Sequence, residues 1–176
     1  MLQHEETHLT LDAFGLSIEN VLILGIGNTL LTDEGIGVYL VDRMQRQVGE
    51  LDGVEYMDGG TLSFTLAEPI ARADGLIVVD AARMDSPPGT LKVFHNDEMD
   101  HYLSGNRASV HEVSLTDLLD IARLSECLPE DRYLIGIEPA SIEWGEHPSE
   151  TVMPAIDLGI KEILSILGKW QVMKLP

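Results

Sequence analysis

Four acidic residues follow apolar segments of the chain, where folding can bring carboxylates together. They are Asp33, Glu34, Asp58 and Asp80. A carboxylate that ends a run such as Leu76-Ile77-Val78-Val79 loses its hydration unless it is paired, hydrogen-bonded or metal-bound. Asp80 is therefore a candidate functional group, with a turn or helix cap as the alternative. Asp33 and Glu34 have a structural alternative too, because acidic side chains favour the first turn of a helix.

His111 is the imidazole that chain order places with these carboxylates, because it introduces the helix expected after the central strands. It does not begin a zinc-protease helix, since Leu115 stands where His-Glu-x-x-His requires its second histidine. Two carboxylates and one imidazole, from Glu34, Asp80 and His111, would make a metal site with open positions, compatible with nickel or zinc. Their spacing in the sequence leaves open whether the three converge.

A glycine-rich segment precedes the first acidic pair. Gly25-Ile26-Gly27 resembles the start of a dinucleotide fingerprint, but Leu30 occupies the place of the third glycine. A pyrophosphate bound there would meet Asp33 and Glu34, where the helix start should serve an anion. The chain also contains no Gly-Lys-Ser/Thr of a phosphate-binding loop. Nucleotide binding is therefore only a minor alternative.

The elements that must position these residues alternate between strand and helix patterns. The continuous apolar run at 21–24 predicts a strand buried on both faces, and further strands are predicted at 54–57, 75–79 and 132–137, with helical spacing in segments between them. This order predicts an α/β fold, a three-layer sandwich of helices around a twisted, mainly parallel sheet of about five strands. The connection to 90–94 is too short for a helix, so that strand is expected at an edge or antiparallel. A polar loop is expected to carry His95, His101 and His111, followed by a helix capped by Ser114, and the last helix begins near Ser149.

Size and charge limit the classes of function. The chain has 176 residues with 44% apolar content, which predicts one domain over residues 21–170 after an extension at residues 1–20. The formal charge of −19, from 30 acidic and 11 basic side chains, disfavours nucleic acid as a partner. The sequence shows neither a membrane span nor a secretory signal, and Cys127 is its only cysteine. We expect a cytoplasmic protein in which Cys127 is a small buried hydrophobe rather than a nucleophile.

Several motifs together resemble one known family. The segment Gly25-Ile26-Gly27-Asn28-Thr29-Leu30-Leu31-Thr32-Asp33-Glu34-Gly35-Ile36-Gly37 looks like the opening signature of the hydrogenase maturation endopeptidases. Later blocks match in order, namely Asp58-Gly59-Gly60-Thr61, Asp80, His111-Glu112-Val113-Ser114-Leu115, Gly136-Ile137-Glu138-Pro139 and Trp144-Gly145. The resemblance covers about residues 21 to 168.

The resemblance implies an endopeptidase that removes the C-terminal extension from the large-subunit precursor of a nickel–iron hydrogenase. Cleavage would follow nickel insertion, with the substrate-bound nickel as the recognition signal. The metal-contacting residues of the family fall on Glu34, Asp80 and His111, and the acidic residue of its second box falls on Asp58. Asp58, Glu34 and Asp80 are the predicted catalytic group, in which Asp58 is the better candidate for assisting hydrolysis by a water molecule. Zinc or another divalent ion could also occupy the site, and a nickel-binding assembly chaperone that does not cut the precursor is the alternative function.

Overall fold

The computed structural model describes residues 18–105 and 113–172, in which five strands form one sheet in the order β2-β1-β3-β5-β4. The strands are β1 (Val21–Ile26), β2 (Val54–Gly60), β3 (Gly75–Ala81), β4 (Leu91–His95) and β5 (Asp131–Ile137). β1 pairs in parallel with β2 and β3, and β3 pairs in parallel with β5. β4 is an edge strand antiparallel to β5, as its short connection predicted.

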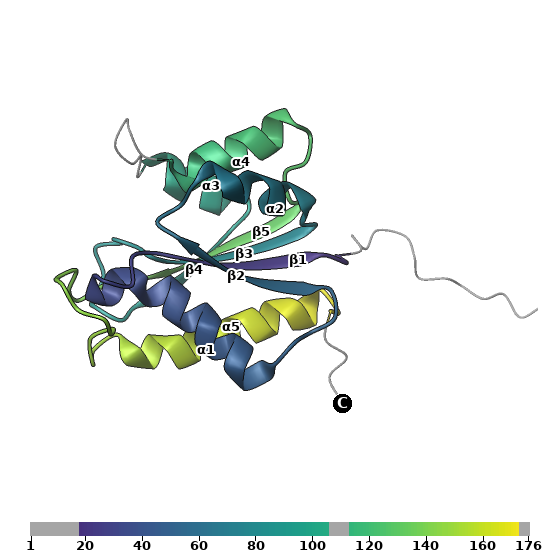
Figure 1. Ribbon diagram of the computed structural model, residues 1–176. Helices are drawn as coiled ribbons and strands as arrows, with labels where there is room; N and C mark the ends of the chain where they lie inside the picture. The colour runs from purple at the N-terminus through teal and green to yellow at the C-terminus, as the bar shows by residue number, and fades with distance from the viewer. Residues whose placement is uncertain (1–17, 106–112, 173–176) are drawn as a thin grey trace, which may run out of the picture.

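Helices cover both faces of this sheet (Figure 1). α1 (Ile36–Val48) and α5 (Met153–Lys169) lie on one face, and α2 (Ala67–Arg72), α3 (Asp97–Gly105) and α4 (Leu115–Leu124) lie on the other. Two short 3₁₀ helices, η1 (Thr32–Gly35) and η2 (Phe64–Leu66), precede α1 and α2. The predicted three-layer α/β fold is therefore confirmed.

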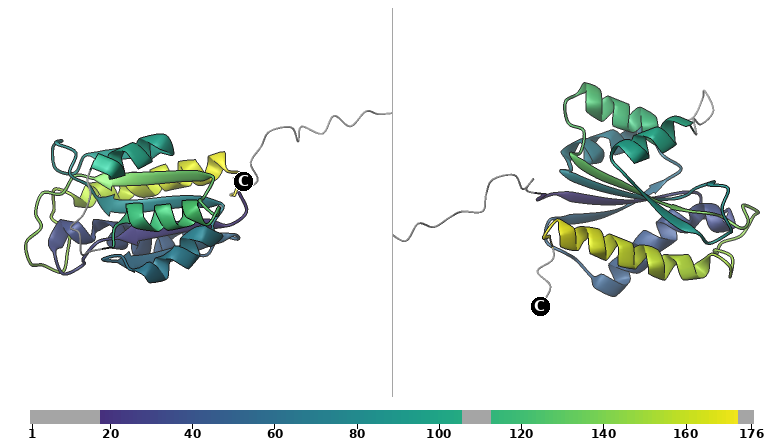
Figure 2. Two further views of the ribbon diagram at one scale, coloured as in Figure 1. Left: turned by 90° about the horizontal axis from the view of Figure 1, so that it is seen from above. Right: turned by 180° about the vertical axis from the view of Figure 1, so that it is seen from behind.

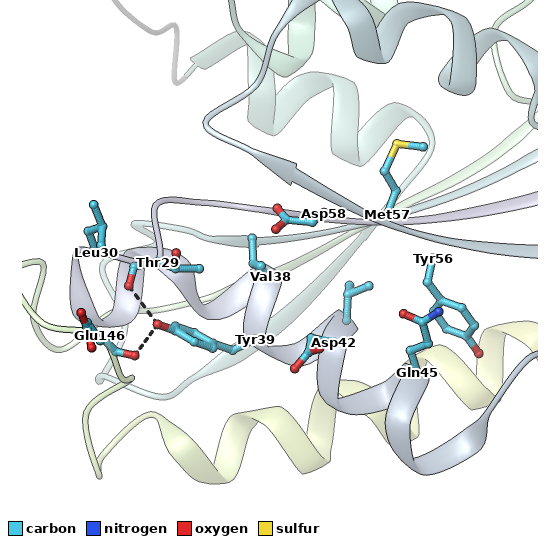
Figure 3. Close-up of a pocket in the computed structure, with 11 residues that line it drawn as sticks. Thr29, Leu30, Val38, Tyr39, Asp42, Gln45, Tyr56, Met57, Asp58 and Glu146 are labelled. Carbon is cyan, nitrogen blue, oxygen red and sulfur yellow. Dashed lines mark hydrogen bonds between the residues drawn. The ribbon is translucent and has the colours of Figure 1, made fainter.

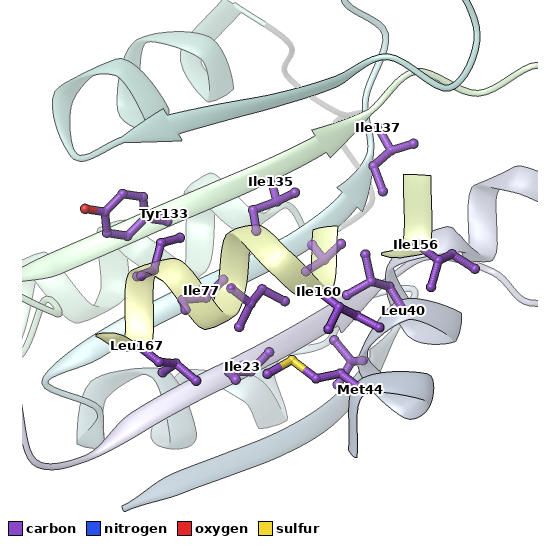
Figure 4. Packing of buried hydrophobic residues seen from close by; sticks show 14 of the residues in the cluster. Ile23, Leu40, Met44, Ile77, Tyr133, Ile135, Ile137, Ile156, Ile160 and Leu167 are labelled. Atoms are coloured by element: carbon purple, nitrogen blue, oxygen red, sulfur yellow. The ribbon is translucent and has the colours of Figure 1, made fainter. Parts of the chain in front are cut away.

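The alternation of side chains along each strand divides the core between the two faces. Ile23 and Ile77 pack in the cluster beneath α1 and α5, which Figure 4 shows from close by. Their neighbours Leu24 and Val78 belong to the cluster beneath α2 and α4. Burial on both faces explains the uninterrupted apolar runs, because neither side of a central strand meets water. The carboxyl ends of the four parallel strands then lie at one edge, where loops converge.

One expected loop is a helix. The polar segment thought to connect β4 to α4 contains α3, and it places His95 in β4 and His101 in α3. Met99 is fully buried beneath the helix, and acidic residues in its first turn suit the positive end of the helix dipole. The sequence predicted a loop here because the segment carries many charges and only Met99 in α3 is fully buried. His111 lies outside the described residues.

Two further features differ from expectation, while a third agrees. Ile18 is buried in the core, three residues before the predicted start of the domain. Cys127 is exposed rather than buried, after α4 and before β5, and therefore at the edge opposite the loops that follow the parallel strands. Ser114 caps α4 through a reciprocal capping box with Asp117, as predicted. Among the described residues, no helix is long and apolar enough to cross a membrane.

Candidate active site

A pocket of about 640 Å³ lies at the carboxyl edge of the parallel strands. Glu34 from η1 and Asp80 from the end of β3 both line it, although they are 46 positions apart in the sequence. The other walls come from the segments after β1 and β2, including Asn28, Leu31 and Phe64. The structure thus brings together two of the three predicted metal ligands.

Close backbone packing holds Glu34 in place. Gly27 has a φ of 131°, and a Cβ atom there would lie 1.8 Å from the carbonyl oxygen of Glu34. Gly37 is equally constrained, since its Cβ would lie 2.1 Å from the carbonyl oxygen of Val79. Only glycine permits these approaches. Gly27, from the segment that resembles a nucleotide fingerprint, therefore lets η1 pack against the end of β1, and Gly37 lets α1 pack against β3.

Asp80 projects from a strand that is buried along most of its length. Leu76 and Val78 pack beneath α2 and α4, so the two-residue period directs Asp80 to the same face. Burial and, to a smaller extent, the negative charge of Glu34 raise the pKa of Asp80, a backbone hydrogen bond from Ala81 lowers it, and the net result is a pKa of about 7. A proton or a cation shared with Glu34 would relieve this repulsion.

Helix α3 adds a tyrosine near this acidic pair. Burial raises the pKa of the Tyr102 hydroxyl, and the charges of Asp80 and Glu138 raise it further. Tyr102 also donates a hydrogen bond to the carbonyl oxygen of Arg83, just beyond β3. Glu138 accepts hydrogen bonds from the amides of Met84 and Ser86, and so orders the same segment. Sequence patterns assign a role to neither Tyr102 nor Glu138, although Glu138 lies in the matching block Gly136-Ile137-Glu138-Pro139, because their bonds to the segment after β3 join distant parts of the chain.

Asp58 lies on the other face of the sheet. Gly25 pairs with both Asp58 and Val79, so these two residues share a face, and Asp80 points to the opposite one. Asp58 lines a separate pocket of about 430 Å³ between β2 and α1 (Figure 3). The segment from Asn28 to Leu31 contributes to both pockets and forms a wall between them. The role of Asp58 in hydrolysis stays a prediction.

The carboxylate of Asp33 has a purely internal set of partners. It is fully buried, and its Oδ2 accepts hydrogen bonds from Ala140 N, Ser141 N and Ser149 Oγ at 2.8, 2.9 and 2.9 Å. Its Oδ1 accepts one from Ser149 N at 2.6 Å. The side chain makes no cap for η1. Asp33 therefore fastens the segment between β5 and α5 to the segment that carries Glu34.

The chemistry of the larger pocket favours a cation. Carboxylate oxygens are suitable ligands for divalent metals, and the low hydration of Asp80 increases the gain from neutralising its charge. Within residues 18–105 and 113–172, no group of three potential metal ligands occurs. Glu34 and Asp80 thus supply two donors, and the third predicted ligand, His111, is outside those ranges.

Comparison with known proteins decides the family. The family model for hydrogenase maturation proteases matches residues 38–166. The chain belongs to the hydrogenase maturation protease family. The protease is 37% identical over 161 residues to the hydrogenase expression/formation protein HupM of Azotobacter chroococcum, covering 91% of this chain and 77% of that one. It is 33% identical over 157 residues to the hydrogenase 2 maturation protease of Escherichia coli, covering 89% and 95%.

A solved structure supports the same assignment. The protease superposes on the hydrogenase maturating endopeptidase HybD from E. coli with a TM-score of 0.78 and 34% identity. The match covers 85% of this chain and 93% of HybD. The family assignment makes the protein a hydrolase that cuts peptide bonds in hydrogenase maturation. The resemblance found in the sequence is thereby confirmed.

Proposed function

We propose that this protease removes the C-terminal extension of a nickel–iron hydrogenase large-subunit precursor, and that it recognises nickel already held by that precursor. The observation that supports nickel recognition is the convergence of Glu34 and Asp80 in one pocket, with repulsion that a cation would relieve. Nickel arrives as part of the substrate, so cleavage becomes conditional on cofactor assembly. We also propose that the protease acts in the cytoplasm, as expected from the sequence.

His111 is the proposed third ligand. The described chain resumes at Val113, which lines the same pocket as Glu34 and Asp80. His111 precedes Val113 by two positions, and two residues of chain span at most about 7 Å. An imidazole with two carboxylates gives the nitrogen and oxygen donors that nickel or zinc accepts.

The proposed nucleophile is a water molecule. Cys127 lies beyond α4, before β5 begins at the opposite edge of the sheet. Water adds to the carbonyl carbon of the scissile bond, the C–N bond breaks, and the leaving amine takes up a proton. Asp58 is the proposed base. A substrate chain that reaches from the pocket of Glu34 and Asp80 to Asp58 would then cross the segment from Asn28 to Leu31, which separates the two pockets. The acidic pair anchors the substrate so that its bond is held near the base.

The experiment uses Glu34→Gln and Asp80→Asn with a nickel-loaded precursor. We expect both variants to lose at least about 100-fold in kcat/KM, because each replaces a charged carboxylate ligand of the recognition site with a neutral amide. Asp52→Asn serves as the matched control, since Asp52 is exposed in the turn before β2. Product mass measures cleavage. Processing by both variants at the wild-type rate would contradict nickel recognition by this pair, and a precursor of unchanged mass with the wild type would favour the chaperone alternative.

A further inference from the structure

Exposed apolar side chains lie on two segments beside the pocket. Trp144 is 81% exposed and Ile142 is 48% exposed in the segment between β5 and α5, and Leu30 is 50% exposed after β1. Isolated exposed apolar residues are common, but a group of them on adjoining segments indicates an interaction surface. We call Leu30, Ile142 and Trp144 the apolar rim.

The two segments of the apolar rim are bonded to each other. Gly145 N donates a hydrogen bond to the carbonyl oxygen of Leu30 at 2.9 Å, and Leu31 forms a parallel bridge with Gly145. In Figures 1 and 2 the segment after β5 lies beside the start of α1. The rim therefore has a defined backbone, although its residues are more than 100 positions apart in the sequence.

Buried polar contacts fix this backbone. The fully buried carboxylate of Asp33 accepts hydrogen bonds from both ends of the segment, at Ala140 and Ser149. Thr32 adds a bond from its hydroxyl to the carbonyl oxygen of Ser141 and one from its amide to Gly145. Thr32 has a φ of 34°, an unfavourable value for a β-branched residue that persists only where surrounding contacts enforce it. The segment is thus held in one shape with its tryptophan in solvent.

This arrangement forgoes the stabilisation that burying a tryptophan would give. Tryptophan is enriched at the centres of protein interfaces, where it contributes much of the binding energy. We propose that the apolar rim is the surface on which the body of the hydrogenase precursor docks while its metal-bearing segment enters the pocket of Glu34 and Asp80. This inference rests on the proposed function, and it adds the contact that binds the folded part of the substrate.

The position of the rim favours the precursor over a second copy of this chain. Leu31 bridges to Gly145 and also lines the pocket, so a partner on the rim borders the pocket mouth. A second copy seated there would obstruct the substrate. Two copies would also bring together Glu143 and Glu146 of each chain. Because each chain carries a net charge of −19, the two copies would repel one another. A partner with an apolar patch surrounded by basic residues suits this surface.

The test compares the double variant Ile142→Ala, Trp144→Ala with the wild type and with Leu124→Ala. Leu124 is 87% exposed at the end of α4, so its variant removes a similar exposed side chain from another edge. With nickel-loaded precursor, the double variant should raise KM at least about 10-fold while kcat stays within about 2-fold, because the lost contacts are equal in the ground and transition states. Direct titration of labelled precursor should show the same loss of affinity. Leu124→Ala should match the wild type. Trp144→Phe, which keeps an aromatic ring at this position, should retain most of the affinity for the precursor that the double variant loses.

The outcomes separate this inference from the proposed function. If the wild type leaves the precursor uncut, the proposed function itself fails. If the wild type cuts the precursor and the double variant has the same KM and affinity, the docking surface is refuted and the proposed function stands. Sedimentation adds a third outcome: a wild-type dimer that the double variant converts to a monomer, with KM unchanged, would assign the rim to self-association and overturn the proposal.

Discussion

Replacement of Asp80 by asparagine should change how the stability of the protein depends on pH. Burial and the charge of Glu34 raise the pKa of Asp80 from 3.8 to about 7 in the folded state. Between these values the unfolded chain has lost the proton and the folded chain retains it, so ionisation progressively destabilises the fold as pH rises. Above the folded pKa, the penalty is constant at roughly 4 kcal/mol, because a tenfold change in an acid dissociation constant corresponds to about 1.4 kcal/mol.

The measurable part of this penalty lies near neutral pH. From about pH 5 to about pH 8.5, the linkage relation gives a growth in the penalty of roughly 2–3 kcal/mol. Asp80→Asn lacks the ionisation, so its free energy of unfolding should rise by that amount relative to the wild type over this range. Any offset from the new amide group is the same at every pH. Urea titrations across the range measure the difference, with the exposed Asp52→Asn as control.

A parallel pH dependence in wild type and Asp80→Asn would refute this reasoning. It would mean that Asp80 ionises in the fold as readily as in the unfolded chain, and that the pocket does not confine two repelling carboxylates. The same result would remove the physical basis for cation recognition by Glu34 and Asp80.

Three further predictions address the elements around the pocket. Gly37→Ala should lower the free energy of unfolding, measured in urea, by at least about 3 kcal/mol, because its Cβ would lie 2.1 Å from the backbone oxygen of Val79, which cannot rotate away. A decrease below about 1 kcal/mol, roughly the effect of an ordinary surface change, would contradict this packing. Asp33→Asn should lower the free energy of unfolding by about 3 kcal/mol and accelerate hydrogen exchange at the backbone amide of Ser149, since the NH2 group of the new side chain would face backbone donors. Unchanged exchange would contradict the role of Asp33 in joining the two segments. Cys127→Ser should process the precursor at the wild-type rate, and a loss of activity would show that a water nucleophile is the wrong assignment.

The architecture was predictable from the sequence because its signals are local and repeated. Apolar runs such as Val21–Leu24 have no polar face, which requires burial on both sides and hence a layered parallel sheet. The missed helix α3 shows the limit of such local signals. Its one fully buried residue, Met99, gives no periodic pattern of its own, and its stability depends on packing against elements distant in sequence.

The site was predictable only in part for a similar reason. Positions after apolar runs could be recognised, so Glu34 and Asp80 were candidates before the motif resemblance united them with His111 and pointed to nickel. The side to which Asp58 points relative to Asp80 depends on the register of β2 with β1 and of β1 with β3, which cannot be read from the sequence. The role of Asp33 also depends on contacts with residues over 100 positions away. Its acidic type and place before a helix suggested a cap, whereas the folded chain uses it to join two segments.

The most direct measurement of the central claim compares precursor with and without nickel. Wild-type protease is incubated with each form at equal concentration, and the mass of the large subunit is followed over time. Nickel recognition by Glu34, Asp80 and His111 predicts that the loaded precursor loses its C-terminal extension while the nickel-free precursor keeps its full mass. Equal rates of processing for the two forms would contradict the claim.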